Sequence, residues 1–298
     1  MHIITLFPND FLWNNTFTSA ITNLATELNF KHYHINMIDD LNGSIDLVPI
    51  TNGKVIYIYT HHPHLDKTHL SRLKSRIPNS KTVMIGGDCI YYGYDNWPVD
   101  LGIEFNRSVV EKMNSMYPSE FIYWTPSKNV FHRIREIRKE QVFEKKYDIM
   151  CLANMHCSAE RINFIEGFCN NDKKIMASLR EYNLDKVIQY YSECNFSLGV
   201  SHAVWGSYEK RSAKGFRDYI GPECGTPLIA DDLPEMTELS DIIPIYPFNN
   251  FIEAIKLMKY YEDNAEEYKN LIEKQKSFFY SINMENQLRP IISKLMET

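Results

Sequence analysis

The sequence lacks the features of a membrane or secreted protein. It has no run of roughly 18 apolar residues, the length that a transmembrane helix needs. Its start, MHIITLFPND, has neither the basic residues nor the long apolar stretch of a signal peptide. It also has no Cys-x-x-Cys pair, and its cysteines are scattered: Cys89, Cys151, Cys157, Cys169, Cys194 and Cys224. Free thiols of this kind are typical of a reducing compartment, so we expect a cytoplasmic protein.

The sequence also lacks a strong excess of basic charge. The formal net charge is -6, with 44% hydrophobic and 23% charged residues, as in ordinary soluble globular proteins. Residues 1–146 carry 16 Lys and Arg against 15 Asp and Glu, whereas the remainder carries 16 against 23. Eight of the ten histidines lie in the first part. The acidic second part is a poor surface for a polyanion, while the first part could face one.

Strand-like and helix-like segments alternate along the chain, with no internal repeat. The first set has strand-like segments at residues 2–7, 54–60, 82–88, 100–105 and 121–126, with helix-like segments at 16–28, 69–76 and 108–116. After a charged connector at 133–146, the second set has strands at 147–153, 196–201, 226–231 and 241–247, and helices at 159–169, 184–194, 215–223 and 251–261. A long charged helical region ends the chain.

This alternation predicts parallel sheets covered by helices on both faces. We expect an α/β fold with two doubly wound, Rossmann-like domains, residues 1–143 and 144–298, that face a central cleft. The last helix can pack back on the first domain. Ligands of such sheets bind beyond the carboxyl ends of the strands, so we expect the functional residues there.

The stretch KGFRDYIGPECGTPLIADD gathers charges around a glycine turn. In a helix, Lys214 and Asp218 would share one face, with Arg217 beside them. A solvated surface ion pair is the plain alternative. Asp231 and Asp232 close the following strand at its carboxyl end, where ligands bind. Cations near that end suit an anionic diphosphate.

Several segments resemble glycosyltransferases of the two-Rossmann (GT-B) architecture, in particular the CgeB-like, spore-protein-type group. PECGTPLIADDLPEMTEL and the following IIPIYPFNNFIEAIKLMKYYEDNAEEY resemble its C-terminal domain. YDIMCLANMHCSAERINFIEGF and VIQYYSECNFSLGVS resemble units of its nucleotide domain. DLGIEFNRSVVEKM and FIYWTPSKNVFHR resemble the last units of its N-terminal domain. The resemblance runs from about Val55 to Tyr268, and the ordered set carries it rather than any single motif.

The resemblance implies transfer of a hexosyl or pentosyl group from a nucleotide sugar, in particular a UDP-sugar. Arg161, Lys214 and Arg217 match basic positions that would neutralise the donor diphosphate as it leaves. Most relatives of this kind retain the anomeric configuration and use no metal. No tightly bound cofactor is therefore expected, and the donor is a co-substrate.

One position departs from the family pattern. The family glutamate that holds the donor ribose, five residues before the glycine, is replaced by Ile220. Asp218 or Glu223 could substitute from a neighbouring position. Thr226 in the glycine turn and His202 in the loop after a strand complete the predicted donor contacts.

Candidate residues on the acceptor side follow the first strands. Asp10 and Asp88 are the candidate catalytic bases if the enzyme inverts configuration, although Asp88 could equally cap a turn. His61 and His62, in THHPHLD, are candidate acceptor contacts together with Asn15. A metal site at these histidines and plain surface histidines are the alternatives.

The acceptor is left open by the sequence: protein, lipid, saccharide or a hydroxymethylated pyrimidine in phage DNA. A phage enzyme would act in the host cytoplasm. The runs HLSRLKSR and RIREIRK could contact DNA phosphates if they share one side of the first domain; otherwise they are solvated faces. A nucleotide-sugar binder that has lost catalysis, and a sugar-phosphate epimerase, are the competing functions.

Overall fold

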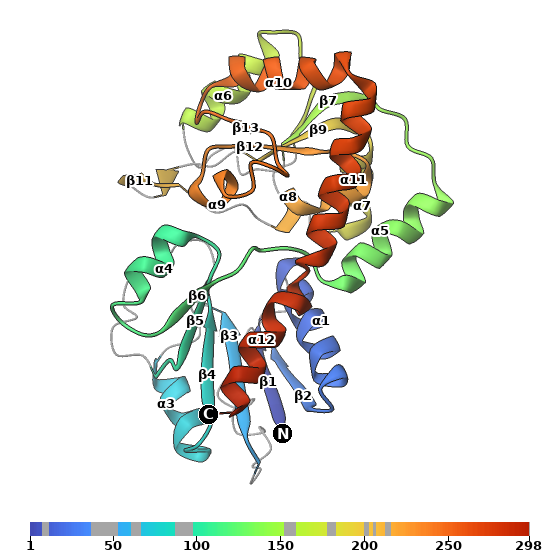
Figure 1. Cartoon of the computed structure of the whole chain (residues 1–298). Helices are drawn as coiled ribbons and strands as arrows, with labels where there is room; N and C mark the ends of the chain where they lie inside the picture. Colours follow the sequence, from blue (N-terminus) through green and yellow to red (C-terminus); the bar gives the residue numbers. More distant parts are fainter. Residues whose placement is uncertain are drawn as a thin grey trace. The chain divides into compact units, whose positions relative to one another are not determined.

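The chain divides into two compact units in the computed structural model (Figure 1). The N-terminal unit comprises Met1–Tyr123 with Met284–Thr298, and the C-terminal unit comprises Trp124–Asn283. The structure describes residues 1–7, 12–36, 53–60, 67–86, 98–151, 159–177, 183–199, 203–204, 207–211 and 216–297. No helix within these residues is long and apolar enough to cross a membrane.

The N-terminal unit is built on a six-stranded sheet whose strand pairs are all parallel. The strand order is β2-β1-β3-β4-β5-β6. The strands are β1 (His2–Phe7), β2 (Lys31–Asn36), β3 (Val55–Thr60), β4 (Lys81–Ile85), β5 (Leu101–Glu104) and β6 (Ser119–Phe121). From Val55 to Tyr59, every residue of β3 is at most 2% exposed. Such a continuous buried run is typical of a parallel strand that is covered on both faces.

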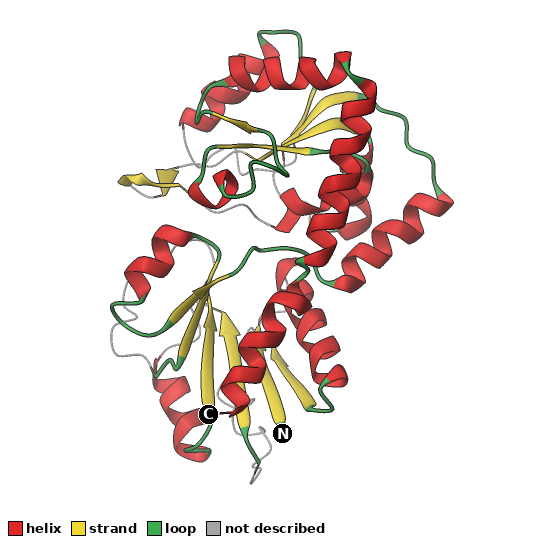
Figure 2. Cartoon of the chain, in the orientation of Figure 1, coloured by secondary structure: helices red, strands yellow, loops and turns green. Residues whose placement is uncertain are grey.

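Four described helices cover this sheet (Figure 2). They are α1 (Leu12–Glu27), α3 (Lys67–Arg76), α4 (Arg107–Met113) and α12 (Met284–Glu297). Leu70 and Leu73 of α3 join Val109 and Met113 of α4 in one core cluster with the strands. The end of the chain, α12, packs on α1, where the Asn23 side-chain amide donates a 2.8 Å hydrogen bond to Glu285.

The C-terminal unit is built on a five-stranded parallel sheet of order β13-β12-β9-β7-β8. The strands are β7 (Tyr147–Cys151), β8 (Ile175–Ala177), β9 (Cys194–Gly199), β12 (Leu228–Asp231) and β13 (Ile245–Tyr246). A separate antiparallel pair is formed by β10 (Ala203–Val204) and β11 (Ser207–Arg211).

Helices surround the C-terminal sheet as well. They are α5 (Lys128–Glu140), α6 (Ala159–Cys169), α7 (Leu184–Ser192), α8 (Phe216–Ile220), the 3-10 turn η2 (Pro222–Cys224), α9 (Pro234–Thr237), α10 (Phe251–Asp263) and α11 (Ala265–Ser281). Phe168 of α6 and Met258 of α10 pack in one core cluster with the strands. The buried Gln275 of α11 bonds both backbone groups of Leu228 at 2.8 Å, which fastens α11 to the start of β12.

The structure departs from the sequence analysis mainly at the segment read as a connector. Residues 128–140 form helix α5, because Val130, Phe131, Ile134 and Ile137 make a buried stripe beneath its charges. Since α5 packs on η2 and α7, the compact units divide before Trp124, ahead of the boundary expected at residue 143. Strands β2 and β8 were not expected from the sequence, and β6 ends at Phe121, where the expected strand begins.

Candidate functional site

The strands of the C-terminal sheet end at one edge because they are parallel, and we call this the carboxyl edge. Four of them end at Cys151, Gly199, Asp231 and Tyr246. Tyr246 is 1% exposed, and its hydroxyl donates to the carbonyl oxygen of Gly199 at 3.2 Å. Burial raises the pKa of Tyr246 well above its ordinary value, and nearby ionisable groups raise it further. In order of effect, these groups are Asp231, Cys151, Asp218 and Asp232.

Three aspartates at the carboxyl edge therefore lie near enough to Tyr246 to raise its pKa. Asp231 is the last residue of β12 and is 1% exposed, which confirms its predicted position. Asp232 accepts a 3.2 Å hydrogen bond from the backbone N–H of Phe248, which joins the segments that follow β12 and β13. Asp218, from α8, precedes these two aspartates in the same stretch of sequence and also lies near Tyr246.

The predicted cations belong to helices that begin near this edge. Arg161 is in the first turn of α6, the helix that follows β7. A helix that follows a parallel strand starts at the carboxyl edge of the sheet. Arg217 lies in α8 next to Asp218, whereas Lys214 lies outside the described residues. The backbone thus brings the Arg161 and Arg217 positions toward the edge that holds the three aspartates.

Thr226 lies at the opposite edge, where the strands begin, which we call the amino edge. Its hydroxyl oxygen is 2.5 Å from the carbonyl oxygen of Tyr191 and 2.9 Å from that of Cys194, the first residue of β9. The Lys145 ammonium donates to the Thr226 hydroxyl and to the Gly225 carbonyl oxygen, both at 3.0 Å, and also to Cys194. Gly225 turns the chain here with a φ of 78°, the left-handed region that favours glycine.

Glu223 shares this amino edge, because it lies in η2 just before the turn. It is 8% exposed, and its carboxylate accepts a 2.7 Å bond from Nε of Arg135 and a 3.4 Å bond from Nη2. Arg138 donates to its backbone oxygen at 2.9 Å. The hydrogen bond with Glu223 raises the pKa of Arg135.

The geometry of Glu223 and Thr226 differs from the expected donor contacts. Both residues hold the fold together at the amino edge, whereas ligands of parallel sheets bind at the carboxyl edge. Ile220, in the family glutamate position, is 0% exposed. Of the carboxylates considered for the donor ribose, Asp218 is the one that lies at the carboxyl edge.

Glu104 is a residue that the sequence analysis missed, at the carboxyl edge of the N-terminal sheet. It is the last residue of β5 and is only 4% exposed. Its carboxylate lies over Gly86, which follows β4: a Cβ there would be 1.9 Å from Oε2. Among the described residues no group forms a hydrogen bond with this carboxylate, and burial raises its pKa to about 8. The only signal in the sequence is an acid that closes an apolar strand.

The other predicted residues lie largely outside the described ranges. These are Asp10, His61, His62, Asp88 and His202. Asn15 lies in α1, of which the backbone alone is described at that position. No group of three or more His, Cys, Asp or Glu within the described ranges could hold a metal ion. The roles of these residues stay predictions.

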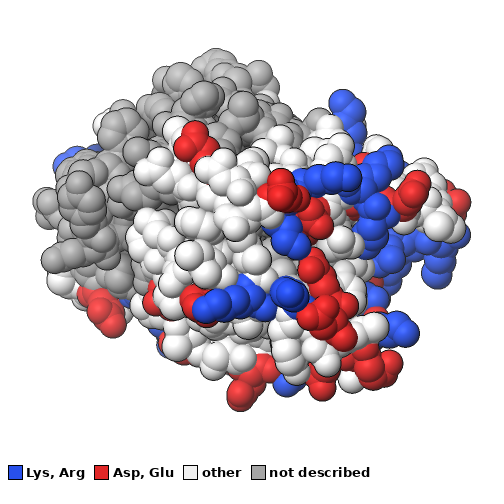
Figure 3. All heavy atoms as spheres, turned by 90° about the horizontal axis from the view of Figure 1, so that it is seen from above, with Lys and Arg blue, Asp and Glu red and all other residues white. Residues whose placement is uncertain are grey.

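The two basic runs belong to different units. HLSRLKSR is part of α3 in the N-terminal unit, and RIREIRK is part of α5 in the C-terminal unit. Arginines of the second run have acidic partners, since Arg133 bonds Asp185 at 2.7 Å and Arg135 bonds Glu223. Figure 3 shows the face of the molecule that is seen from above. On this face the basic side chains gather toward one side, with acidic side chains interspersed among them. The described residues of this face therefore form neither a purely basic nor a purely acidic surface.

No protein-family model and no curated protein sequence matches the chain. Solved structures do match. The E. coli trehalose-6-phosphate structure bound with UDP-2-fluoro glucose has a TM-score of 0.65 at 6% identity, over 100% of this chain and 99% of that chain. A trehalose-6-phosphate synthase studied for glycosyl transfer with retention has a TM-score of 0.61 at 9% identity, over 96% and 85%. The DNA-modifying β-glucosyltransferase has a TM-score of 0.54 at 10% identity, over 100% of both chains.

The chain has the GT-B fold. This confirms the α/β, two-Rossmann-like fold that the sequence predicts, with a parallel sheet in each unit. Identities this low show the fold alone, so the CgeB-like group stays a prediction. In this fold, ligands bind beyond the carboxyl ends of the parallel strands, so the carboxyl edges described above are the candidate binding sites.

Proposed function

We propose that the chain is a glycosyltransferase that moves a hexosyl or pentosyl group from a UDP-sugar to a hydroxyl acceptor. The observation that carries the proposal is the end-to-end similarity to UDP-sugar enzymes. The chain aligns over its whole length with nearly the whole of the UDP-2-fluoro glucose complex, rather than through one shared Rossmann unit. Fold alone does not establish activity, so the residues at the carboxyl edges must supply the rest.

The donor binds at the carboxyl edge of the C-terminal sheet in this proposal. In the reaction, the bond between the anomeric carbon and the diphosphate oxygen breaks, and UDP leaves with the electron pair. Arg161, Lys214 and Arg217 stabilise the charge that develops on the diphosphate. Asp218 takes the place of the missing glutamate and accepts hydrogen bonds from the ribose hydroxyls. His202 lines the sugar, and no metal is required because the cations neutralise the diphosphate.

The acceptor hydroxyl attacks the anomeric carbon and loses its proton. In a retaining reaction the leaving diphosphate itself takes this proton, and this is the outcome we propose. The trehalose-6-phosphate synthase studied for retention supports it. An inverting reaction needs a carboxylate base, for which Asp10, Asp88 and Glu104 are the candidates. Glu104 favours this second outcome, since a carboxyl with a pKa near the working pH is an efficient base.

The first test is a thermal-shift screen of the whole chain against nucleoside diphosphates and nucleotide sugars. A ligand that binds only the folded state raises the melting temperature by mass action. We expect UDP to raise it and one UDP-sugar to raise it further. No shift with any nucleotide would contradict the proposed donor site. Tight nucleotide binding without hydrolysis or transfer would favour the non-catalytic binder, for which the buried Ile220 is the supporting observation.

The acceptor that we propose to test first is a hydroxymethylated pyrimidine in DNA. Its support is the full-length similarity to a DNA-modifying β-glucosyltransferase. Radiolabelled UDP-glucose would be incubated with duplexes that contain 5-hydroxymethylcytosine or, as the control, unmodified cytosine. Label on the hydroxymethylated duplex alone supports this acceptor, and NMR of the product distinguishes retention from inversion. If neither duplex is labelled although the protein binds UDP-glucose, saccharide and protein acceptors should be tested next. The acidic net charge makes this second outcome a real alternative.

A further inference from the structure

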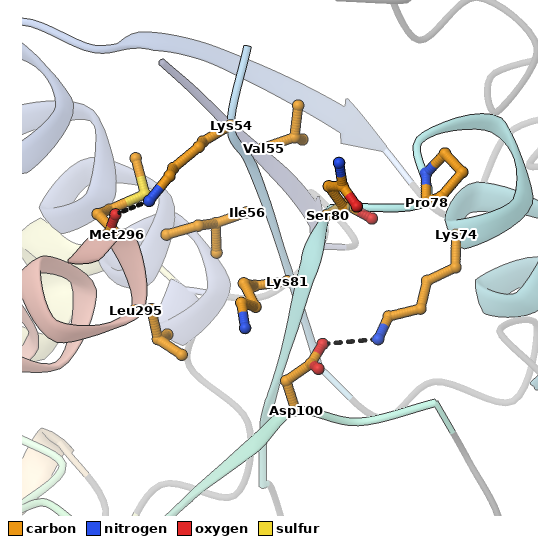
Figure 4. A pocket seen from close by; sticks show the side chains of 11 residues that line it. Lys54, Val55, Ile56, Lys74, Pro78, Ser80, Lys81, Asp100, Leu295 and Met296 are labelled. Atoms are coloured by element: carbon orange, nitrogen blue, oxygen red, sulfur yellow. Dashed lines mark hydrogen bonds and ion pairs between the residues drawn. The ribbon is translucent and has the colours of Figure 1, made fainter. Parts of the chain in front are cut away.

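The N-terminal unit contains a cavity at the amino edge of its sheet, at the opposite end of the strands from Glu104 (Figure 4). Its volume is about 440 Å³, within the range of roughly 300–1,000 Å³ that is usual for small-molecule sites. Its walls come from the starts of β3, β4 and β5 and from the end of α12. The residues that matter for its chemistry are Lys54, Lys74, Ser80, Lys81 and Asp100.

Positive charge dominates the cavity, because three lysines face one carboxylate. Lys74 pairs with Asp100 at 2.8 Å. Asp100 also accepts hydrogen bonds from the backbone N–H of Thr82 at 2.7 Å and from its hydroxyl at 2.9 Å. Burial raises the pKa of Asp100, but the bonds from Lys74 and Thr82 outweigh this effect and lower it. The single carboxylate is thus already engaged with Lys74 and Thr82.

The other two lysines are not neutralised by that carboxylate. The Lys54 ammonium donates to the backbone oxygen of Met296 at 2.5 Å, a neutral acceptor near the end of α12. Within the described part of the chain, Lys81 has neither a hydrogen-bond partner nor an ion-pair partner for its ammonium. In the view of Figure 4, Lys81 lies between the Lys54–Met296 pair and the Lys74–Asp100 pair. The cavity therefore has two positive charges in excess.

A buried hydroxyl supplies an independent sign of a missing partner. Ser80 lines the cavity and is 3% exposed. Its hydroxyl has no hydrogen-bond partner among the described residues. Buried polar groups of native proteins nearly always have a partner, in the protein or outside it. Asn79, next to it, adds an amide to the same wall.

We propose that this cavity binds a phosphate-bearing small molecule. A phosphate monoester carries close to two negative charges at neutral pH and offers several acceptor oxygens, which matches the excess charge and the donors of the cavity. Lys81 and Lys54 contact the phosphate, and the Ser80 hydroxyl donates to it. The site is separate from the proposed donor site, because it lies at the amino edge of the other unit. It therefore does not depend on the proposed function.

The test is calorimetric titration of the whole chain with inorganic phosphate and with glycerol 3-phosphate, in wild type and variants. K81Q removes the charge that has no partner, and we expect at least ~tenfold weaker binding, the size of one charge-assisted hydrogen bond. S80A removes only the buried hydroxyl, and we expect binding weaker by about threefold with unchanged folding. K259Q is the matched control: it removes the same charge from an exposed position on helix α10 in the C-terminal unit, and we expect unchanged binding.

The R217A variant separates this site from the donor site. We expect it to bind glycerol 3-phosphate like the wild type while its binding of UDP weakens. The proposal is overturned if the wild-type chain binds neither phosphate compound at millimolar concentration. It is equally overturned if K81Q and S80A bind like the wild type, or if R217A rather than K81Q removes the binding. Circular dichroism of each variant shows whether its fold is intact, and S80A keeps the test decisive should K81Q unfold.

Discussion

Charged side chains have different surroundings at the two edges of the C-terminal sheet. At the amino edge, Arg135 bonds Glu223 and so joins α5 to η2, and Lys145 bonds Thr226 and so joins the segment before β7 to the turn before β12. At the carboxyl edge, Asp231 and its neighbours gather around one buried tyrosine. Both groups come from one short stretch of sequence that crosses the sheet. The spacing of charged residues in the sequence brings them near a strand, and the tertiary structure decides at which end of the strand each of them lies.

The amino edges of the two units also differ. In the C-terminal unit the cations meet protein acceptors, as in the contact between Lys146 and Glu193 at 2.8 Å. In the N-terminal unit the corresponding edge is hollow, and Lys81 has no such partner among the described residues. A cation in a concave site without a protein partner suits an anionic ligand.

The largest effect is expected from Arg217, at the carboxyl edge. R217A should lower the rate of sugar transfer by about 10²–10³-fold, the cost of losing one donor to developing charge. Its melting temperature should change little, because in the proposed function the residue contacts the donor diphosphate rather than the rest of the fold. The surface variant R133A is the control. If R217A transferred the sugar at a near-wild-type rate, the donor diphosphate would not bind at this edge.

A smaller effect, on stability alone, is expected from Lys145 at the amino edge. The residue as a whole is exposed, yet its ammonium donates to three oxygen atoms. Burial of the ammonium, and then the charge of Arg138, lower the pKa of Lys145 to about 8, so it is still mainly charged at pH 7. K145M removes three hydrogen bonds at the amino edge and should lower the free energy of unfolding by ~1–2 kcal/mol, as measured by urea denaturation at pH 7.

The neighbouring variant, K146M, is the matched control for K145M. Lys146 is half exposed and makes a single pair, with Glu193, so its loss should leave the urea midpoint nearly unchanged. Nucleotide binding should persist in both variants. Equal midpoints for K145M and K146M would show that the three contacts of Lys145 do not stabilise the amino edge.

Glu104 should make stability depend on pH. Its pKa of about 8 in the fold exceeds the ordinary 4.5, so the folded state holds this proton more tightly than the unfolded state. The resulting stabilisation is complete below pH 4.5 and is lost as pH rises to about 8. E104Q cannot ionise, so its stability relative to wild type should increase by up to ~4 kcal/mol between pH 5 and pH 9. Urea midpoints at the two pH values measure this difference.

The control for E104Q is E120Q on the neighbouring strand β6. Glu120 is partly exposed and pairs with Lys294 at 3.5 Å, so its replacement should add no comparable pH dependence. Parallel stability curves for E104Q and wild type would mean that the Glu104 carboxylate is solvated and is not a group of raised pKa.

The smallest effects are expected at Glu223 and Asp218, the two acidic residues that were considered as contacts of the donor ribose. E223Q should cost ~0.5–1 kcal/mol of stability, because its partner Arg135 is 40% exposed and solvent screens the pair. UDP affinity should stay within about twofold of wild type. D218N should instead weaken UDP binding by roughly three- to tenfold, the loss of a charge-assisted hydrogen bond. Weaker UDP binding in E223Q than in D218N would reverse the assignment.

Local patterns predicted part of the fold and failed where contacts are remote. The apolar runs of β1, β3 and β4 predicted their strands because both faces of a parallel sheet are buried. Strand β2, KHYHIN, was missed because it is polar. Its His32 and His34 meet the hydroxyl of Thr5 on β1 at 2.9 and 3.0 Å, and burial, followed by the charge of His34, lowers the pKa of His32 to about 4. No local pattern in the sequence predicts that β2 pairs with β1.

The sequence by itself determined that two sets of parallel strands form and that Asp231 closes one of them. The tertiary structure alone decided which charged groups meet. It placed Glu104 against Gly86, which follows another strand, Asp218 near Tyr246, and Glu223 against Arg135 of a helix read as a connector. The physical reason is that strand formation follows from local periodicity. The state of a charged group depends instead on burial and on partners that only the folded chain brings together.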